Sequence, residues 1–402
     1  MQNQGNLTTL ATARLHLFKT VCLPSILHQS YHDFLWFIKI DPNLDEGIRN
    51  ELIHVIHDAV EILLLESERR NTHAAYGEAS DAQDTYTGTV SSLRDRIFVI
   101  GSNTNYVIGH DIGSWRGGIV SEEVLSHHSK DQIYMGNVDL LRMAQKAEPE
   151  KVVLETRLDA DDGLNEGYVA YLHRDSMKRF HGITDHESSS QIKQEQHGVE
   201  IASKADSYKW FYWCVETHFK WYLNAEGEYG QLAGERRKSF CVTPGLTVGY
   251  NVGTSLDDVP SFPHHELVKN LQGNRSCFEL GDENQDAKDR TAPCVELVHG
   301  FIGAVRARTA TSAGMDDIKG KRSKEVNEDL WDVLEDRFDI MMEDAIEVKQ
   351  YFKENLLQIA KENLIGQCRP GHSCKESSQT KLKRIIESSG GDDKDGLVSR
   401  GI

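Results

Sequence analysis

The stretch that decides the fold is Val152-Val153-Leu154-Glu155-Thr156-Arg157-Leu158-Asp159-Ala160-Asp161-Asp162-Gly163-Leu164. Its first part is a short apolar run, which predicts a buried strand over 152–158. Three carboxylates then follow within four residues, and a glycine comes directly after them. Strands of open α/β sheets present ligands at their carboxyl ends. We therefore expect the acidic residues at the mouth of a crevice.

The spacing of the first two of these carboxylates indicates a metal site. Asp159 and Asp161 alternate with Ala160, and alternate side chains of an extended chain point the same way. With little else nearby to neutralise them, two such carboxylates favour Mg²⁺ or Mn²⁺, which one or two carboxylates and phosphate oxygens commonly hold. The alternative is a solvated acidic turn, because Asp and Gly are common turn residues.

The composition argues against a nucleic-acid partner and against a membrane span. The chain has 402 residues, of which 39% are hydrophobic and 27% charged, and its formal net charge is -18. A nucleic-acid partner is not expected, because phosphate binding needs clustered Lys and Arg. No run of about 18 apolar residues predicts a membrane span. Of the seven cysteines, Cys368 and Cys374 are interpreted as a local disulfide or free thiols rather than a zinc site with His372.

Hydrophobic periodicity predicts alternating helices and strands. The predicted helices are 7–30 with a break at Pro24, 44–65, 165–180, and one or two helices over 329–364. The predicted strands are 34–40, 97–100, 152–158, paired strands within 208–222, and 236–242. Polar insertions are predicted at 66–95, 183–207 and 282–290. This order predicts an α/β fold with a doubly wound, mostly parallel sheet flanked by helices, polar insertions and a long C-terminal helix.

The same pattern divides the chain into three parts. We expect one α/β domain over 1–320 and a helical extension over 321–375. The tail over 376–402 is polar, and we expect it to be disordered because it has too few apolar residues to bury.

Two further features indicate contacts with a phosphorylated ligand. The segment from Val305 to Met315 holds Arg306, Arg308 and three hydroxyl side chains. Arginine recognises phosphate through two parallel hydrogen bonds, although a basic surface loop is an equal alternative. Asp41 follows the 34–40 strand, where it either contacts a nucleotide or caps the next helix.

Three blocks of the sequence resemble a known family, the rhamnosyltransferase-like glycosyltransferases of the GT-A type. They are Ala13 to Phe18 with Cys22-Leu23-Pro24-Ser25, Phe34 to Pro42, and Thr156 to Leu164. The similarity spans roughly residues 7 to 320, with gaps at the polar insertions, and the block from Arg308 to Met315 also matches a recurrent element of these proteins.

The resemblance implies a GT-A-like domain that takes a nucleotide-sugar donor and a carbohydrate or glycoconjugate acceptor. Its D-x-D motif falls on Asp159 and Asp161, which would hold Mn²⁺ or Mg²⁺, and the sugar would be rhamnose or another hexose. The expected donor-binding residues are Asp41, Arg157, Asp162, Arg306, Arg308, Thr309 and Ser312. The resemblance also implies a first strand upstream of Met1. With an upstream anchor the protein would lie in the Golgi lumen, and without one in the cytoplasm.

The residue that deprotonates the acceptor is not singled out by the sequence. An inverting enzyme needs a carboxylate or histidine opposite the donor, and the expected bases are Glu216 and Asp258, with Asp257, His264 and His265 as alternatives. His265, or equally His264, is a candidate third metal ligand. Two other functions use the same residues: a metal-dependent hydrolase, which would turn over without an acceptor, and a non-catalytic carbohydrate-binding protein.

Overall fold

The fold was analysed in a computed structural model of the 402-residue chain. The described residues are 7–74, 93–101, 132–147, 151–181, 208–223, 228–254, 259–260, 262, 264–271, 277, 294–308 and 329–367. Several predictions concern residues outside these ranges. They are the predictions for Asp257, Asp258, Thr309, Thr311, Ser312, the 183–207 and 282–290 insertions, the cysteine pair Cys368 and Cys374, and the 376–402 tail.

The chain begins with a helix of three segments. They are α1 (Thr8–Leu17), the π-helix η1 (Phe18–Cys22) and α2 (Leu23–Leu27). Pro24 lies in the first turn of α2, where it has no N–H to donate and its ring needs space beside the carbonyl one turn earlier. A widened π turn provides that space. The interruption predicted at Pro24 is thereby confirmed.

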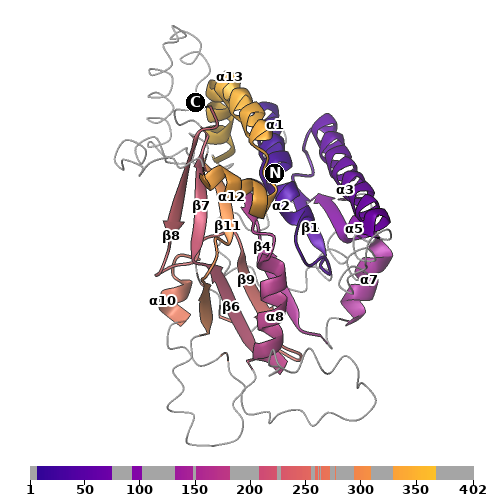
Figure 1. The fold of residues 1–402 in the computed structure, drawn as a ribbon, viewed down its shortest axis with the longest axis vertical. Helices are drawn as coiled ribbons and strands as arrows, with labels where there is room; N and C mark the ends of the chain where they lie inside the picture. The colour runs from indigo at the N-terminus through magenta and orange to yellow at the C-terminus, as the bar shows by residue number, and fades with distance from the viewer. Residues whose placement is uncertain are drawn as a thin grey trace, which may run out of the picture.

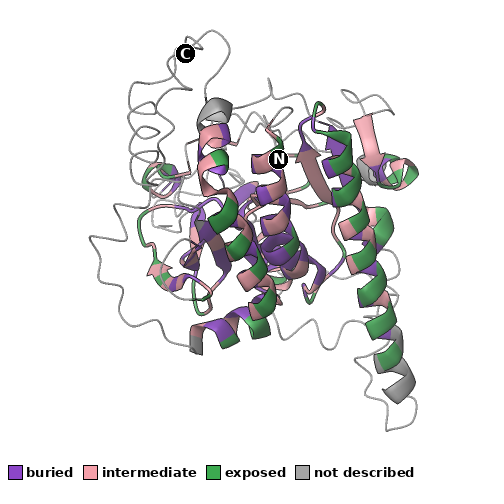
Figure 2. Ribbon diagram, turned by 90° about the horizontal axis from the view of Figure 1, so that it is seen from above, coloured by how far each residue is buried: buried purple, intermediate pink, exposed green. Residues whose placement is uncertain are grey.

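The first sheet has the order β1-β2-β3, with β1 (Trp36–Ile40) parallel to β2 (Ile97–Gly101) and β2 antiparallel to β3 (Ile133–Met135). The long helix α3 (Glu46–Ala74) lies beside it with α5 (Leu93–Arg96) and α7 (Val138–Ala147) (Figure 1). Apolar residues of α3 are buried at one-turn intervals, and its outward side is exposed (Figure 2). The predicted 66–95 insertion is wrong at both ends, because α3 continues to Ala74 and Leu93 is buried in α5.

Two four-stranded sheets follow. One has the order β10-β6-β9-β4 and comprises β10 (Val295–Val298), β6 (Trp210–Val215), β9 (Leu246–Tyr250) and β4 (Val153–Arg157). The other, which we call the charged sheet, has the order β5-β11-β7-β8 and comprises β5 (Asp162–Leu164), β11 (Ala304–Arg308), β7 (Thr217–Tyr222) and β8 (Gln231–Arg236).

The α/β class is confirmed, but the mostly parallel, doubly wound sheet is wrong. Parallel pairing is confined to β1–β2, β10–β6 and β11–β7, and the other strand pairs of the described residues are antiparallel. Short connections such as the one from β7 to β8 cannot make the long crossover that parallel strands need. The strands predicted within 208–222 are confirmed as β6 and β7, yet they lie in different sheets rather than pairing with each other.

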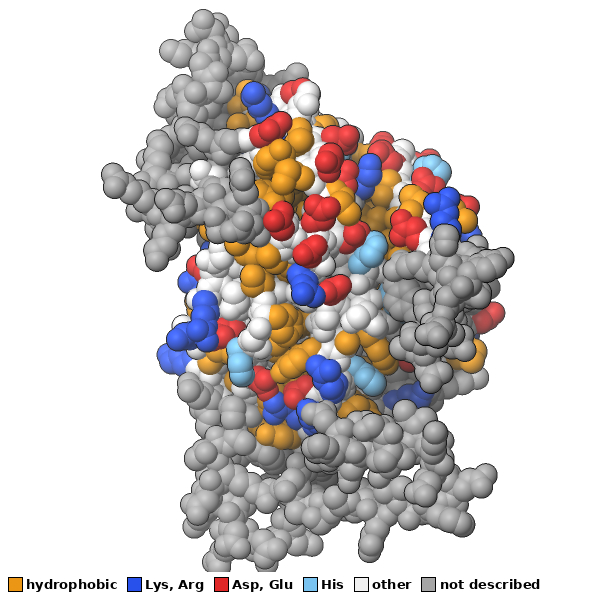
Figure 3. Space-filling model, in the orientation of Figure 1, with side chains coloured by type: hydrophobic (Ala, Val, Ile, Leu, Met, Phe, Trp, Pro, Cys, Tyr) orange, Lys and Arg blue, Asp and Glu red, His pale blue; other side chains and the backbone are white. Residues whose placement is uncertain are grey.

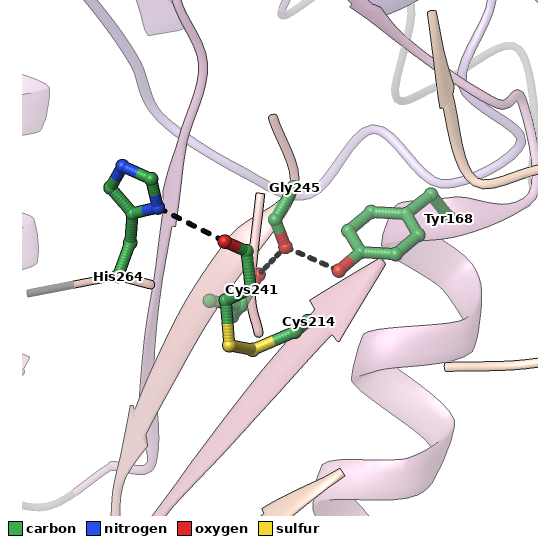
Figure 4. The surroundings of a disulfide bond; sticks show 6 residues. Tyr168, Cys214, Cys241, Gly245 and His264 are labelled. Atoms are coloured by element: carbon green, nitrogen blue, oxygen red, sulfur yellow. Dashed lines mark hydrogen bonds between the residues drawn. A yellow bond between two sulfur atoms is a disulfide. The ribbon is translucent and has the colours of Figure 1, made fainter. Parts of the chain in front are cut away.

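The predicted strand 236–242 is also wrong. Residues 237–245 form the connection from β8 to β9, and the disulfide between Cys214 and Cys241 ties it to β6 (Figure 4). Tyr168 donates a hydrogen bond to the carbonyl of Gly245 in the same connection. A second disulfide, Cys277–Cys294, lies in the same hydrophobic cluster as the first. Both disulfides are therefore buried parts of the core.

Helices cover both four-stranded sheets. α8 (Tyr168–His181) packs Leu172 and Phe180 on Phe211 and Trp213 of β6. α12 (Asp329–Phe338) and α13 (Met342–Gln367) lie with α1 over the apolar side of the charged sheet (Figure 1). Asp339, with φ of 55°, separates α12 from α13, so the predicted C-terminal helical region contains two helices. The short α10 (Leu267–Leu271) completes the described helices. No helix among the described residues is both long and apolar enough to cross a membrane.

Candidate functional site

The acidic turn, residues 159–162, connects β4 to β5 and so carries the chain from one sheet to another. Asp162 donates its backbone N–H to the carbonyl of Asp159 at 3.0 Å. The extended geometry expected for Asp159 and Asp161 is therefore wrong, since the chain reverses between them. The two side chains nevertheless interact, because the charge of Asp159 acts on Asp161.

The N-terminal helix packs against the residues that directly follow the acidic turn. A Cβ at Gly163 would lie 3.0 Å from the carbonyl oxygen of Val21 and 2.9 Å from Cγ1 of Val305, so the helix backbone and β11 leave room only for glycine. Leu164 donates its N–H to Oγ of Ser25 at 3.2 Å, and Gln29 donates to the carbonyl of Asn165 at 2.8 Å. The acidic turn is therefore held on a rigid helix and a strand.

Arginine side chains surround the acidic turn. Arg157 Nη2 lies 3.7 Å from Oδ1 of Asp159, and Arg306 Nε lies 3.4 Å from Oδ1 of the fully buried Asp162. Arg14 of α1 interacts electrostatically with Asp161 and Asp159, and burial lowers its pKa while these two carboxylates act in the opposite direction. The expectation that little lies nearby to neutralise the carboxylates is wrong.

Sequence reasoning missed Arg14 as a site residue. An arginine within a helical pattern ordinarily indicates a solvated face, and only its place in the Ala13 to Phe18 block marked it. In the structure Ala13 and Leu15, on either side of Arg14, are buried in the core, and Arg14 acts electrostatically on Asp159 and Asp161.

The electrostatics of Asp161 bear on metal binding. Burial raises its pKa, the charge of Asp159 adds to the rise, and Arg14 and Arg306 oppose it. Carboxylates supply the oxygen ligands that Mg²⁺ or Mn²⁺ takes. No group of three or more His, Cys, Asp or Glu side chains in the described part of the chain is arranged to hold a metal ion. Metal binding by Asp159 and Asp161 therefore stays a prediction.

The polar side of the charged sheet continues from the acidic turn. Arg306 is in register with Asp162 on one side and with Lys220 on the other. Glu235 forms ion pairs with Lys220 and Arg237, and its Oε2 lies 3.4 Å from Nε2 of the buried His218. Burial lowers the pKa of His218 to about 4; Glu235 acts in the opposite direction, and Lys220, Arg306 and Arg237 add to the lowering. A network of charges therefore runs across β5, β11, β7 and β8.

Asp41 is buried at the end of β1, where its Oδ1 accepts a hydrogen bond from the N–H of Asn43 at 2.9 Å. The helix α3 is capped instead by Asp45, whose Oδ1 accepts from the N–H groups of Gly47 and Ile48 at 2.9 and 3.2 Å. The alternative that Asp41 caps the next helix is therefore wrong, and Asp41 shapes the turn after β1.

The other predicted residues lie apart from the acidic turn or outside the described residues. Glu216 is ion-paired to Arg236 at 3.0 Å with only 8% of its side chain exposed. His265 lies 3.9 Å from Glu266 and does not join a metal-holding group in the described region. His264 contacts the carbonyl of Cys241 at 3.0 Å (Figure 4). Arg308 ends β11, but its side chain is outside the described part.

Comparison with curated proteins finds no match, and neither does comparison with solved structures. A family model described as "Putative rhamnosyl transferase" matches residues 9–94. The matched segment includes Arg14, β1, Asp41 and all of α3, and it ends before the acidic turn. The resemblance expected from the sequence is therefore confirmed for this segment: residues 9–94 are similar to the rhamnosyl transferase family.

Proposed function

We propose that this protein is a GT-A-type glycosyltransferase that moves a sugar, with rhamnose suggested by the family description, from a nucleotide-diphosphate donor to an acceptor hydroxyl. One observation carries the proposal: in the acidic turn Asp159 lies 3.7 Å from Arg157 and Asp162 lies 3.4 Å from Arg306, and Arg14 acts electrostatically on Asp159 and Asp161. Carboxylates suit a divalent cation and guanidinium groups suit phosphate. Together they support the proposal of a metal diphosphate as the ligand.

Glycosyl transfer requires the site to stabilise the leaving diphosphate. Arg306 lies on the inner strand β11 and interacts with both Asp161 and Asp162, and its guanidinium is proposed to bind a phosphate beside the turn. Arg157, Arg308, Thr309 and Ser312 are proposed to add donor contacts, and Asp41 to contact the nucleotide. Asp159 and Asp161 would hold Mn²⁺ or Mg²⁺, which supplies Lewis-acid neutralisation of the diphosphate when bound.

The acceptor hydroxyl needs a base. Glu216 and Asp258 remain the proposed candidates, and Glu216 is the one whose position is described. Its ion pair with Arg236 keeps a carboxylate at the start of β7, and a substrate hydroxyl would compete with that arginine. His265 remains a proposed metal ligand. This role depends on residues outside the described region, which would have to bring its side chain to the acidic turn.

Partners and compartment are part of the same proposal. A carbohydrate or glycoconjugate acceptor is proposed from the family description. The chain has a net charge of -18, and acidic side chains gather over the upper part of one face (Figure 3). We assign residues 1–320 to the catalytic domain and 321–375 to its helical extension. The two buried disulfides support folding in an oxidising compartment such as the Golgi lumen, because such bonds are rare in reducing compartments.

The test is release of the nucleoside diphosphate from UDP-, GDP- and dTDP-sugars, including the rhamnose donors, by the full chain with Mn²⁺ or Mg²⁺. We expect turnover with one donor, loss of turnover with EDTA, and a decrease of about two orders of magnitude for Asp161→Asn. Asp139→Asn is the control, since Asp139 is exposed on α7 and pairs with Arg142.

Other outcomes assign the protein differently. Full turnover that needs no acceptor and is not increased by any would indicate the hydrolase. Binding of glycans without turnover of any donor would indicate the carbohydrate-binding protein. Equal activity of Asp161→Asn and wild type would contradict the role of the acidic turn.

A further inference from the structure

The charged sheet carries a cluster of polar side chains on β7 and β8, away from the acidic turn. His218 of β7 is directly opposite Glu235 of β8 in the antiparallel register, so both side chains lie on the same side of the sheet. Lys220, two residues further along β7, shares that side. Lys220 and Arg237 both form ion pairs with Glu235. Nε2 of His218 lies 3.4 Å from Oε2 of the same carboxylate. We call these four residues the β7–β8 cluster.

Two side chains of this cluster hold buried nitrogen atoms that make no hydrogen bond with the described residues. His218 has 1% of its side chain exposed, and in the described part of the chain neither ring nitrogen has a hydrogen-bond partner. The buried Nε of Arg237 likewise has none among the described residues. A neutral imidazole has one N–H to donate and a guanidinium has five. Because an unpaired buried donor costs desolvation free energy, both groups favour an acceptor that a ligand brings in. Arg237 keeps 32% of its side chain exposed, so a ligand can reach the cluster from that side.

The charges of the cluster favour an oxyanion that carries a single negative charge. Lys220 and Arg237 attract an anion, and its oxygens can accept hydrogen bonds from Arg237 and His218. The carboxylate of Glu235 lies in the same cluster and repels the ligand. By Coulomb's law this repulsion is about twice as large for a doubly charged ligand as for a singly charged one. A carboxylate or a sulfate ester is therefore preferred over a phosphate ester.

The place of the cluster in the sheet points to the acceptor rather than the donor. The acidic turn borders β5, whereas β7 and β8 lie on the other side of β11. Arg237 donates its backbone N–H to the carbonyl of Glu216 at 2.8 Å. The cluster therefore adjoins the residue proposed above as the base for the acceptor hydroxyl.

We propose that His218, Lys220 and Arg237 bind the carboxylate or sulfate ester of an acidic sugar, and that the acceptor of this protein is an acidic glycan. The assignment to the acceptor rests on the proposed function, whereas binding of the acidic sugar itself depends only on the β7–β8 cluster. Glu235 holds Lys220 and Arg237 in place and limits the ligand to one negative charge.

The experiment is calorimetric titration of the full chain at pH 7.5, without metal or nucleotide, with glucuronate, glucose 6-sulfate, glucose 6-phosphate and glucose. We expect glucuronate or glucose 6-sulfate to bind about tenfold or more tightly than the other two sugars, and the tighter of the pair identifies the acidic group. Arg237→Gln should weaken this binding about tenfold or more, because it removes hydrogen bonds between charged groups. Arg142→Gln should match wild type, since Arg142 pairs with exposed Asp139 on α7.

The pH dependence of binding gives a readout that a merely structural role would not change. A bound anion favours the imidazolium form of His218, so glucose 6-sulfate should bind about fivefold or more tightly at pH 5.0 than at pH 7.5. The other charged groups that act on this imidazole are Glu235, Lys220, Arg306 and Arg237. Burial acts to raise the pKa of Glu235, but Lys220 and Arg237 outweigh it and lower that pKa, so this carboxylate stays ionised at pH 5.0. His218→Asn should remove the pH dependence.

Several results would overturn the inference. They are equal binding of acidic and neutral sugars by wild type, glucose 6-phosphate that binds as tightly as glucuronate, and unchanged binding in Arg237→Gln. A pH dependence that persists in His218→Asn would also contradict it. Should Arg237→Gln fail to fold by circular dichroism, Lys220→Met provides a second variant with the same expected loss.

The inference and the proposed function fail in different ways. If the protein turns over a nucleotide sugar but binds acidic and neutral sugars alike, the acidic-sugar site is wrong and the glycosyltransferase proposal stands. If it binds the acidic sugar as expected but turns over no donor, the proposed function is wrong, and the cluster is the ligand site of a carbohydrate-binding protein.

Discussion

His218 offers a stability prediction that depends only on burial and charge. It lies on β7 with its side chain 1% exposed, and both ring nitrogens lack a hydrogen-bond partner. Glu235 favours its protonation, but burial together with Lys220, Arg306 and Arg237 opposes it, which lowers the pKa to about 4. The folded protein therefore keeps this imidazole neutral at pH values where the unfolded chain protonates it.

The direction of the effect follows from that difference. Above the unfolded pKa of about 6.5 both states are neutral, and the contribution of His218 to stability is fully present. As the pH falls below 6.5, the unfolded chain binds a proton on this imidazole, whereas the folded protein does not. The free energy of unfolding therefore decreases until about pH 4. A tenfold difference in proton affinity is worth about 1.4 kcal/mol, so the loss is about 2 kcal/mol at pH 5 and about 3 kcal/mol at completion.

The assay is urea unfolding at pH 7.5 and pH 5.0 of wild type, His218→Asn and His54→Asn. Asparagine does not titrate, so the stability lost between the two pH values should be smaller in His218→Asn by about 2 kcal/mol, whatever its absolute stability. His54 is exposed on α3, and its variant should lose as much as wild type. Equal losses in His218→Asn and wild type would refute the buried neutral histidine.

The remaining predictions concern the two disulfides and the packing at Gly163. Replacing both Cys214 and Cys241 by serine, which opens a loop with a sequence separation of 27, should lower the free energy of unfolding by about 3.5 kcal/mol, measured by denaturant unfolding. Non-reducing peptide mapping should find this bond and Cys277–Cys294 in the native protein, and reduced pairs would contradict the proposed oxidising compartment. Gly163→Ala should cost about 1–3 kcal/mol and weaken Mn²⁺–diphosphate binding, because the new Cβ would displace β5 from the helix below it. Gly234→Ala is the matched strand control, since nothing lies within 4 Å of its Cβ position, and an equal cost in both would argue against tight packing under the acidic turn.

Much of the local structure could be predicted from hydrophobic periodicity. The apolar runs before Asp41 and Asp159 form β1 and β4, and the spaced apolar residues of 44–65 lie within α3. The helix after the acidic turn is α8, and the break at Pro24 is where expected. Each of these features depends on the spacing of apolar residues within one segment. That spacing can be read directly from neighbouring positions of the sequence.

The candidate site was predicted only in part. Asp159, Asp161, Asp162, Arg157 and Arg306 could be chosen because carboxylates and arginines stand out in the sequence, and the structure brings them together. Arg14 could not be chosen from its pattern, since its electrostatic interactions with the acidic turn join residues about 150 positions apart. Glu216 was chosen for its chemistry, but its pairing with Arg236 depends on how β7 and β8 meet.

The sequence by itself therefore determined the α/β class, most helices and strands, and the acidic character of the turn. Only the tertiary structure decided which strands share a sheet, which cysteines pair, and which arginines neutralise Asp159 and Asp161. Strand pairing and charge pairing depend on groups distant in the chain, and many pairings satisfy the same local pattern. The reversal at residues 159–162 shows this: the local spacing of Asp159 and Asp161 suited an extended strand, whereas β5 pairing with β11 required a turn.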